Sequence, residues 1–153
     1  MAFVFGYGSL MGDGYKRAHL RGFRRAWNVA MDNRVTIPGY KYYVDPDGSR
    51  PAVYVTFLNL VPGEGVDGVV VDADLDELDA RERNYTRVDV SDAIDLPGPV
   101  YAYVGLAEAT ERFEAGRREG RAVVTRGYLE SLRGVAQAPA LPVLDLTRVE
   151  VPA

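Results

Sequence analysis

Residues 51–61 restrict the possible folds more than any other segment of the chain. The segment is rich in Val, Tyr, Thr and Phe, and apolar side chains occupy both of its alternating faces. A strand of this kind has to be covered on both sides, as in a barrel or in a sheet with helices across it. The sequence therefore predicts a domain organised around a buried strand.

Further strands are predicted on both sides of this segment, and the helices come mostly after them. Runs rich in apolar or β-branched residues, separated by Gly and Pro turns, predict strands over residues 2–5, 23–31, 66–73, 85–90 and 100–104. Helical spacing predicts helices over residues 107–116 and 123–135, and residues 144–149 are interpreted as a last strand or a docked tail. This order indicates an α+β fold with a mixed or antiparallel sheet that tends to a barrel.

Length and composition limit the number of domains and the kinds of chemistry. The chain has 153 residues and no repeat, linker or low-complexity tract, so residues 1–153 are expected to form a single domain. It contains no cysteine and one histidine, His19, which excludes thiolate catalysis and a multi-histidine metal site. No metal site is therefore predicted.

Charge and hydropathy bear on partners and location. The formal net charge of −4 at pH 7 argues against nucleic acid as a partner. No apolar run approaches the roughly 18 residues of a membrane span. Residues 1–10 lack the basic leader and the cleavage site of a signal peptide. We therefore expect a cytoplasmic protein without a membrane partner.

A helix is predicted to begin after Asp74. This residue is suited to cap a helix, and Glu77, three positions further on, completes a capping box. The helix is expected to run to about Arg83 or a little further. It contains the first candidate catalytic residue.

A carboxylate lies on the apolar stripe of this predicted helix. At about 100° per residue, Leu75, Leu78, Glu82 and Tyr85 share the face that must turn toward the core. Burial disfavours the charged form of a carboxylate, which suits a general acid/base. Two alternatives remain open, namely an ion pair from Glu82 to an arginine such as Arg87, and a helix that ends before Glu82. Periodicity by itself favours these alternatives.

A glycine-dense loop follows the first predicted strand, with Gly6, Gly8, Gly12 and Gly14 inside nine residues. Such a loop lets the backbone approach a ligand and point N–H groups at a carboxylate, a phosphate or a developing oxyanion. The dinucleotide fingerprint fails at Met11, and a looser match through Gly12 needs a crossover helix next. A plain glycine turn, a ligand loop and a dinucleotide loop all remain open.

Two motifs in this order carry a resemblance to a known family. The first is Phe-Gly-Tyr-Gly-Ser-Leu at residues 5–10, and the second is Leu-Asp-Ala-Arg-Glu at residues 78–82, followed by Tyr-Thr-Arg at residues 85–87. Residues 59–62 and 66–70 are similar to the central hairpin of the same family. Over residues 3–104 the chain resembles the gamma-glutamylcyclotransferase-like superfamily.

The resemblance implies a small mixed-strand β-barrel with flanking helices and a substrate pocket with one essential glutamate. Matched residue by residue, the glutamate is Glu82. The positions matched to substrate binding are Tyr7, Gly8, Ser9, Leu10, Tyr85 and Tyr128. A glycine often follows the glutamate in this family, whereas Arg83 and Asn84 stand here, which leaves the shape of the substrate open.

The resemblance also implies an enzymatic activity. A small gamma-glutamyl amide would be cleaved by attack of its own α-amine, releasing 5-oxoproline and a free amine or amino acid, with Glu82 as general acid/base and without a metal or an organic cofactor. One alternative is a non-catalytic small-molecule-binding domain of the same fold. The other is a nucleotide-binding oxidoreductase that uses the glycine loop.

Overall fold

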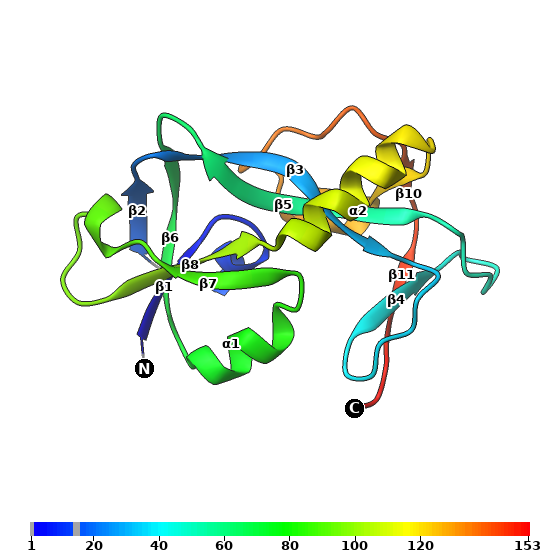
Figure 1. Cartoon of the computed structure of the whole chain (residues 1–153), viewed down its shortest axis with the longest axis horizontal. Helices are drawn as coiled ribbons and strands as arrows, with labels where there is room; N and C mark the ends of the chain where they lie inside the picture. The colour runs from blue at the N-terminus through cyan, green and yellow to red at the C-terminus, as the bar shows by residue number, and fades with distance from the viewer. Residues whose placement is uncertain (1, 14–15) are drawn as a thin grey trace. The chain divides into compact units, whose positions relative to one another are not determined.

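The computed structural model describes residues 2–13 and 16–153. The chain divides into two compact units. Unit 1 consists of Met1–Ala26 and Leu58–Gly105, and unit 2 consists of Trp27–Phe57 and Leu106–Ala153. Strands β3 (Phe23–Asp32) and β5 (Tyr54–Pro62) each contribute residues to both units. Figure 1 shows the elements of both units.

Unit 1 contains a five-stranded mixed sheet with the strand order β2-β6-β1-β8-β7. Its strands are β1 (Ala2–Gly6), β2 (Lys16–Leu20), β6 (Val66–Ala73), β7 (Tyr85–Asp89) and β8 (Val100–Gly105). The central strand β1 runs antiparallel to β6 and parallel to β8. The other elements are the 3-10 turns η1 (Ser9–Asp13) and η2 (Ser91–Ala93) and the helix α1 (Leu75–Arg81).

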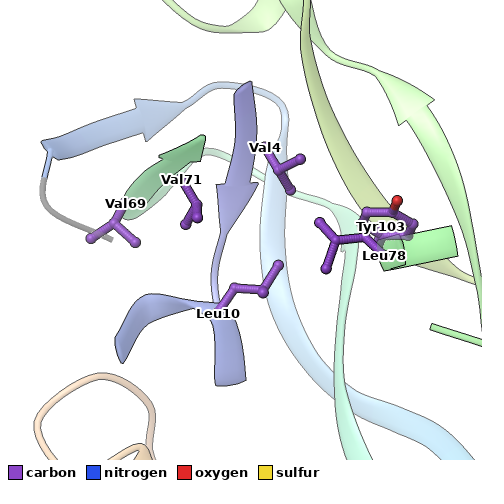
Figure 2. Close-up of a cluster of buried hydrophobic side chains, with 6 residues drawn as sticks. All are labelled: Val4, Leu10, Val69, Val71, Leu78 and Tyr103. Carbon is purple, nitrogen blue, oxygen red and sulfur yellow. The ribbon is translucent and has the colours of Figure 1, made fainter. Parts of the chain in front are cut away.

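One apolar cluster joins the sheet of unit 1 to the loop after β1 and to α1 (Figure 2). Its buried members are Val4, Leu10, Val69, Val71, Leu78 and Tyr103. Leu75 and Tyr85 are partly buried and pack against it. The predicted stripe of α1 is therefore confirmed for Leu75 and Leu78, whereas Tyr85 reaches the same cluster from strand β7. The loop and the helix are held by the same core.

Unit 2 contains most of a second sheet, in which the strand order is β10-β9-β5-β3. Strand β9 (Ala122–Thr125) runs parallel to β5 at Tyr54 and Val55, and β10 (Val143–Leu144) runs parallel to β9. A two-stranded sheet pairs β4 (Lys41–Val44) with β11 (Thr147–Glu150).

Two helices, α2 (Ala107–Arg118) and α3 (Arg126–Ser131), complete unit 2. Phe113 of α2 is buried in a cluster with Tyr54 of β5. A Cβ atom on Gly116 of α2 would lie 2.8 Å from the Cβ of Tyr54. The helix therefore approaches β5 at a helix position that carries no side chain.

The predicted α+β class is confirmed, and β6 has the predicted bounds. Strand β5 is buried on both faces, as its composition predicts, with Tyr54 to Leu60 all removed from solvent. In the part of the chain that the structure describes, the strands form three open sheets. The edge strands of the two larger sheets are β2 and β7 in one and β10 and β3 in the other, so no closed barrel forms there.

Two local predictions are wrong, and strands were also missed. The helix expected over residues 123–135 covers only Arg126–Ser131, because Ala122–Thr125 pairs with β5 as a strand. Strand β2 was not predicted from the sequence. Helix α1 ends at Arg81 instead of near Arg83, because the chain turns at once into β7.

Candidate functional site

The loop after β1 continues directly into the 3-10 turn η1, in which the N–H of Met11 donates to the carbonyl oxygen of Gly8 at 3.0 Å. Its side chains have different surroundings. Tyr7 and Leu10 are buried, whereas Gly8 is half-buried and Ser9 is exposed. Of the four loop residues matched to substrate binding, two therefore anchor the loop in the core, and Gly8 and Ser9 are accessible to a solute.

Hydrogen bonds from two strands hold this loop. The hydroxyl of Tyr7 donates to the backbone oxygen of Tyr103 in β8 at 2.6 Å. The guanidinium of Arg25 in β3 donates to the backbone oxygen of Tyr7 at 2.8 Å and to that of Asp67 at 2.7 Å. A loop fixed on both sides presents its backbone in one geometry, as a binding loop requires.

Gly6 is required by close approach and not by an unusual backbone angle. A Cβ atom on Gly6 would lie 2.9 Å from the Cβ of Leu10 and 3.3 Å from the carbonyl carbon of Leu10. Neither Gly6 nor Gly8 has a positive φ angle. Gly6 therefore lets the loop fold back on itself, and the predicted approach of this loop to a ligand stays a prediction. Gly14 lies outside the described residues.

The interpretation as a dinucleotide-binding loop is wrong. That fingerprint needs a helix after the glycine loop, with its N-terminus at the phosphates. Here the loop leads to β2, which runs antiparallel to β6 with Leu20 opposite Val66. Because this segment is a strand and not a helix, the structure does not support a nucleotide-binding oxidoreductase.

Helix α1 carries the second motif. Its N-terminus is capped as predicted, because the side chain of Asp74 accepts hydrogen bonds from the N–H groups of Asp76 and Glu77. Glu82 is the C-terminal cap, and its N–H donates to the carbonyl oxygen of Leu78 at 2.8 Å. The N–H of Tyr85 then donates to the carbonyl oxygen of Glu82 at 3.1 Å. Glu82 thus stands at the junction between helix and strand.

The side chain of Glu82 is largely buried, with 18% of its surface exposed. Its Oε1 atom lies 3.5 Å from a guanidinium nitrogen of Arg81, whose side chain is half exposed, so this ion pair is long and weakened by solvent. The alternative partner considered for Glu82, Arg87, instead pairs with Asp79 at 3.1 Å. The second alternative was a helix that ends before Glu82, and α1 does end at Arg81. The side chain of Glu82 nevertheless remains mostly out of solvent.

Tyr85 is tied into the sheet region immediately after this glutamate. Its hydroxyl donates to the backbone oxygen of Leu58 at 2.7 Å, and its ring packs against the apolar cluster. Unit 1 therefore brings the loop residues, Glu82 and Tyr85 into one compact body.

Tyr103 is a residue of this region that the sequence patterns did not single out. Its hydroxyl donates to a carboxylate oxygen of Asp79 in α1 at 2.6 Å. Burial raises the pKa of Tyr103 above its ordinary value. The hydrogen bond to Asp79 and the negative charges of Asp79 and Glu82 raise this pKa further, whereas the positive charge of Arg87 lowers it. Tyr103 thus stays a protonated donor at neutral pH. The strand pattern of residues 100–104 predicts a strand but does not show which side chain meets α1.

Tyr128 belongs to unit 2, whereas the other residues matched to the family's site belong to unit 1. It lies in α3, where its N–H donates to the hydroxyl oxygen of Thr125 at 3.3 Å. Its ring stands edge-on to Trp27 and to Phe57, with centroids 5.7 Å and 5.3 Å away.

Two further observations apply to the described part of the chain. None of its helices is long and apolar enough to cross a membrane. Within the same residues, no group of three or more His, Asp or Glu side chains could hold a metal ion.

One comparison with known proteins, that with a family model, covers both motifs. The sequence model of the family described as gamma-glutamyl cyclotransferase, AIG2-like, matches residues 4–120, a range that includes Glu82 and Tyr85 and ends before Tyr128. A solved structure titled "Gamma-glutamyl cyclotransferase" aligns with a TM-score of 0.40 at 15% identity, covering 94% of this chain and 94% of that chain. No curated protein matches the sequence.

Proposed function

The chain belongs to the gamma-glutamyl cyclotransferase, AIG2-like family, and we propose from this membership that it cleaves a gamma-glutamyl amide, with Glu82 as the general acid/base. The observation that carries the proposal is the family match over both motifs, residues 7–10 and Glu82. The geometry supports it, because a mostly buried carboxylate and a braced glycine loop belong to one compact unit.

The reaction is intramolecular. In a gamma-glutamyl amide the α-amine and the γ-carbonyl carbon lie one five-membered ring apart, so the enzyme mainly holds the folded conformer and moves protons. The α-amine is largely protonated at neutral pH. Glu82 removes this proton, and the amine nitrogen forms a bond to the γ-carbonyl carbon. The bond from that carbon to the leaving nitrogen then breaks and Glu82 returns its proton to that nitrogen. The second proton of the ring nitrogen passes to the released amine, which leaves as an ammonium ion.

This scheme needs no co-reactant, because one amide becomes 5-oxoproline and a free amine or amino acid. We assign the backbone N–H groups of Gly8 and Ser9 to the developing oxyanion or to the α-carboxylate of the substrate, since these two residues are the loop positions that a solute can reach. Tyr7, Leu10 and Tyr85 shape and hold this region. Tyr128 is assigned to substrate on the family resemblance.

The test is a panel of gamma-glutamyl amino acids, peptides and amines incubated with the protein and assayed for 5-oxoproline. Glu82→Gln is expected to keep the fold and to lower kcat/KM by about 100-fold or more, the range typical of losing a general acid/base. Glu77→Gln is the matched control, because it makes the same change at an exposed position of the same helix. It is expected to keep wild-type turnover.

Two outcomes would contradict the proposal. If Glu82→Gln retained a tenth of the wild-type rate, the proton transfer would belong to another group. If gamma-glutamyl compounds bound to the wild-type protein without release of 5-oxoproline from any member of the panel, the chain would be a binding domain of the same fold.

A further inference from the structure

We propose that Tyr103 is a positioning residue for Glu82, acting through the hydrogen bond from its hydroxyl to Asp79. The proposal rests on the proposed function of Glu82. It adds a residue that neither motif contains, since Tyr103 lies on β8, at a distance in sequence from both the loop and α1.

Tyr103 contacts both parts of the candidate site. Its backbone oxygen accepts the hydroxyl of Tyr7 at 2.6 Å, which holds the loop. Its own hydroxyl donates to Asp79 at 2.6 Å, which holds α1. Its ring is buried in the apolar cluster, where Figure 2 shows it beside Leu78. Tyr103 on strand β8 thus links the loop to helix α1.

Asp79 is held from a second side. Its other carboxylate oxygen pairs with Arg87 of β7 at 3.1 Å, and the Arg87 guanidinium lies over the ring of Tyr101 at 5.3 Å from its centroid. The last turn of α1 is therefore tied to β8 by the partly buried hydrogen bond of the Tyr103 hydroxyl and to β7 by an ion pair. Asp79 precedes Glu82 by three positions, and the N–H of Glu82 donates to the carbonyl oxygen of Leu78, so the position of this last turn sets the backbone from which Glu82 projects.

The length of α1 makes these contacts important. The helix has seven residues, and isolated helices shorter than about 12 residues are marginal in water, so its position depends on tertiary contacts. Catalysis by a positioned group is sensitive to small displacements, since a shift of about 1 Å can cost about 100-fold in rate. Loss of the Tyr103 hydroxyl removes one of the two polar ties of Asp79 while leaving the ring in the core.

The experiment compares Tyr103→Phe with the wild-type full-length protein, using a gamma-glutamyl substrate that the wild type turns over. We expect kcat to fall by about tenfold or more with KM within twofold, because the reacting group is displaced and substrate contacts are kept. Backbone amide exchange at residues 79–84 is measured in parallel and should be faster in the variant. Tyr101→Phe removes a hydroxyl two positions away on the same strand and should change neither quantity.

Asp79 variants separate the hydroxyl contact from the ion pair. Asp79→Ala breaks both contacts and should reproduce the loss in Tyr103→Phe. Asp79→Asn keeps an oxygen for the Tyr103 hydroxyl but loses the charge pair with Arg87, so it should retain most of kcat. If Tyr103→Phe failed to fold, the contrast between Asp79→Ala and Asp79→Asn would carry the test.

The results distinguish this proposal from the proposed function. A folded Tyr103→Phe with kcat within twofold of wild type, or with a raised KM and unchanged kcat, overturns the positioning role. If the wild type turned over no member of the panel, the proposed function would fail. Amide exchange would then decide the positioning role, with faster exchange at residues 79–84 in Tyr103→Phe supporting it and unchanged exchange overturning it.

Discussion

Gly68 shows how a single residue can set the distance between two strands. A Cβ atom at this position would lie 2.5 Å from the backbone oxygen of Gly6 and 2.6 Å from Cζ of Phe5, both on the paired strand β1. The first of these atoms is backbone and the second belongs to a buried ring, so neither can move away at low cost. Gly6 itself begins the glycine loop, which makes this close approach part of the support of the candidate site.

Gly68→Ala is therefore expected to destabilise the protein by about 3 kcal/mol, at the upper end of ordinary overpacking. Gly127→Ala is the control, because a Cβ atom on Gly127 in α3 would meet no other atom within 4 Å and its φ is not positive. It should change stability by less than about 1 kcal/mol, in the stabilising direction. Urea unfolding monitored by circular dichroism measures both. Equal stability of Gly68→Ala and wild type would show that the strands can separate without cost.

At the scale of the element, α1 depends on its first residue as much as on its packed face. Asp74 accepts hydrogen bonds from two N–H groups that have no partner inside the helix. Leu78 is the buried side chain that seats the helix on the sheet. The C-terminal end carries Glu82, so disorder at either end of so short a helix reaches the candidate site.

Asp74→Ala should cost about 1 kcal/mol of stability, the usual effect of losing a side-chain cap. Asp74→Asn keeps the accepting oxygen and should lose at most a few tenths of that. The two variants are compared by their midpoints of urea unfolding at equal m-values. An alanine variant as stable as the asparagine variant would mean that water replaces the cap fully.

At the scale of the whole molecule, stability in acid depends on how carboxylates are paired. Hydrogen bonds from Arg34 hold the pKa of Asp32 below its ordinary value, and the charges of Arg34 and Arg112 lower it further, against burial. A carboxyl whose pKa is lower in the folded than in the unfolded state adds stability above its unfolded pKa of about 4. That contribution is lost as the pH falls through the folded value.

We therefore expect Arg34→Met to be less stable than wild type at pH 7, with a difference that shrinks below about pH 4, where unfolded Asp32 is protonated. Arg118→Met removes the same charge from an exposed position of α2 and should show no such pH dependence. Unfolding free energies from pH 2.5 to 7 measure both. A difference that stayed constant with pH would place the role of Arg34 in packing over Tyr54.

The two compact units are expected to unfold together, as a single domain would. Strands β3 and β5 pass from one unit into the other, so neither unit has a complete set of its own strands. Trp27, the one tryptophan of the chain, belongs to unit 2 and reports on it by fluorescence. Gly68→Ala in unit 1 should lower the thermal midpoint seen by Trp27 as much as that seen by calorimetry. An unchanged Trp27 midpoint would mean that the units unfold independently.

The sequence alone determined those features that depend on neighbours along the chain. The bounds of β6, the Asp74 cap and the stripe of Leu75 and Leu78 follow from side-chain periodicity and from capping chemistry, which act over a few residues. The loop and Glu82 were likewise found as local motifs. Their catalytic and binding roles stay predictions.

Tertiary structure decided what depends on partners far away in sequence. Lys16–Leu20 is mostly exposed and becomes a strand because it pairs with β6, and Ala122–Thr125 extends because it pairs with β5. The Tyr103–Asp79 contact joins residues 24 positions apart on different elements. Strand pairing and side-chain hydrogen bonds of this kind are set by the packing of whole elements, and no local periodicity contains that information.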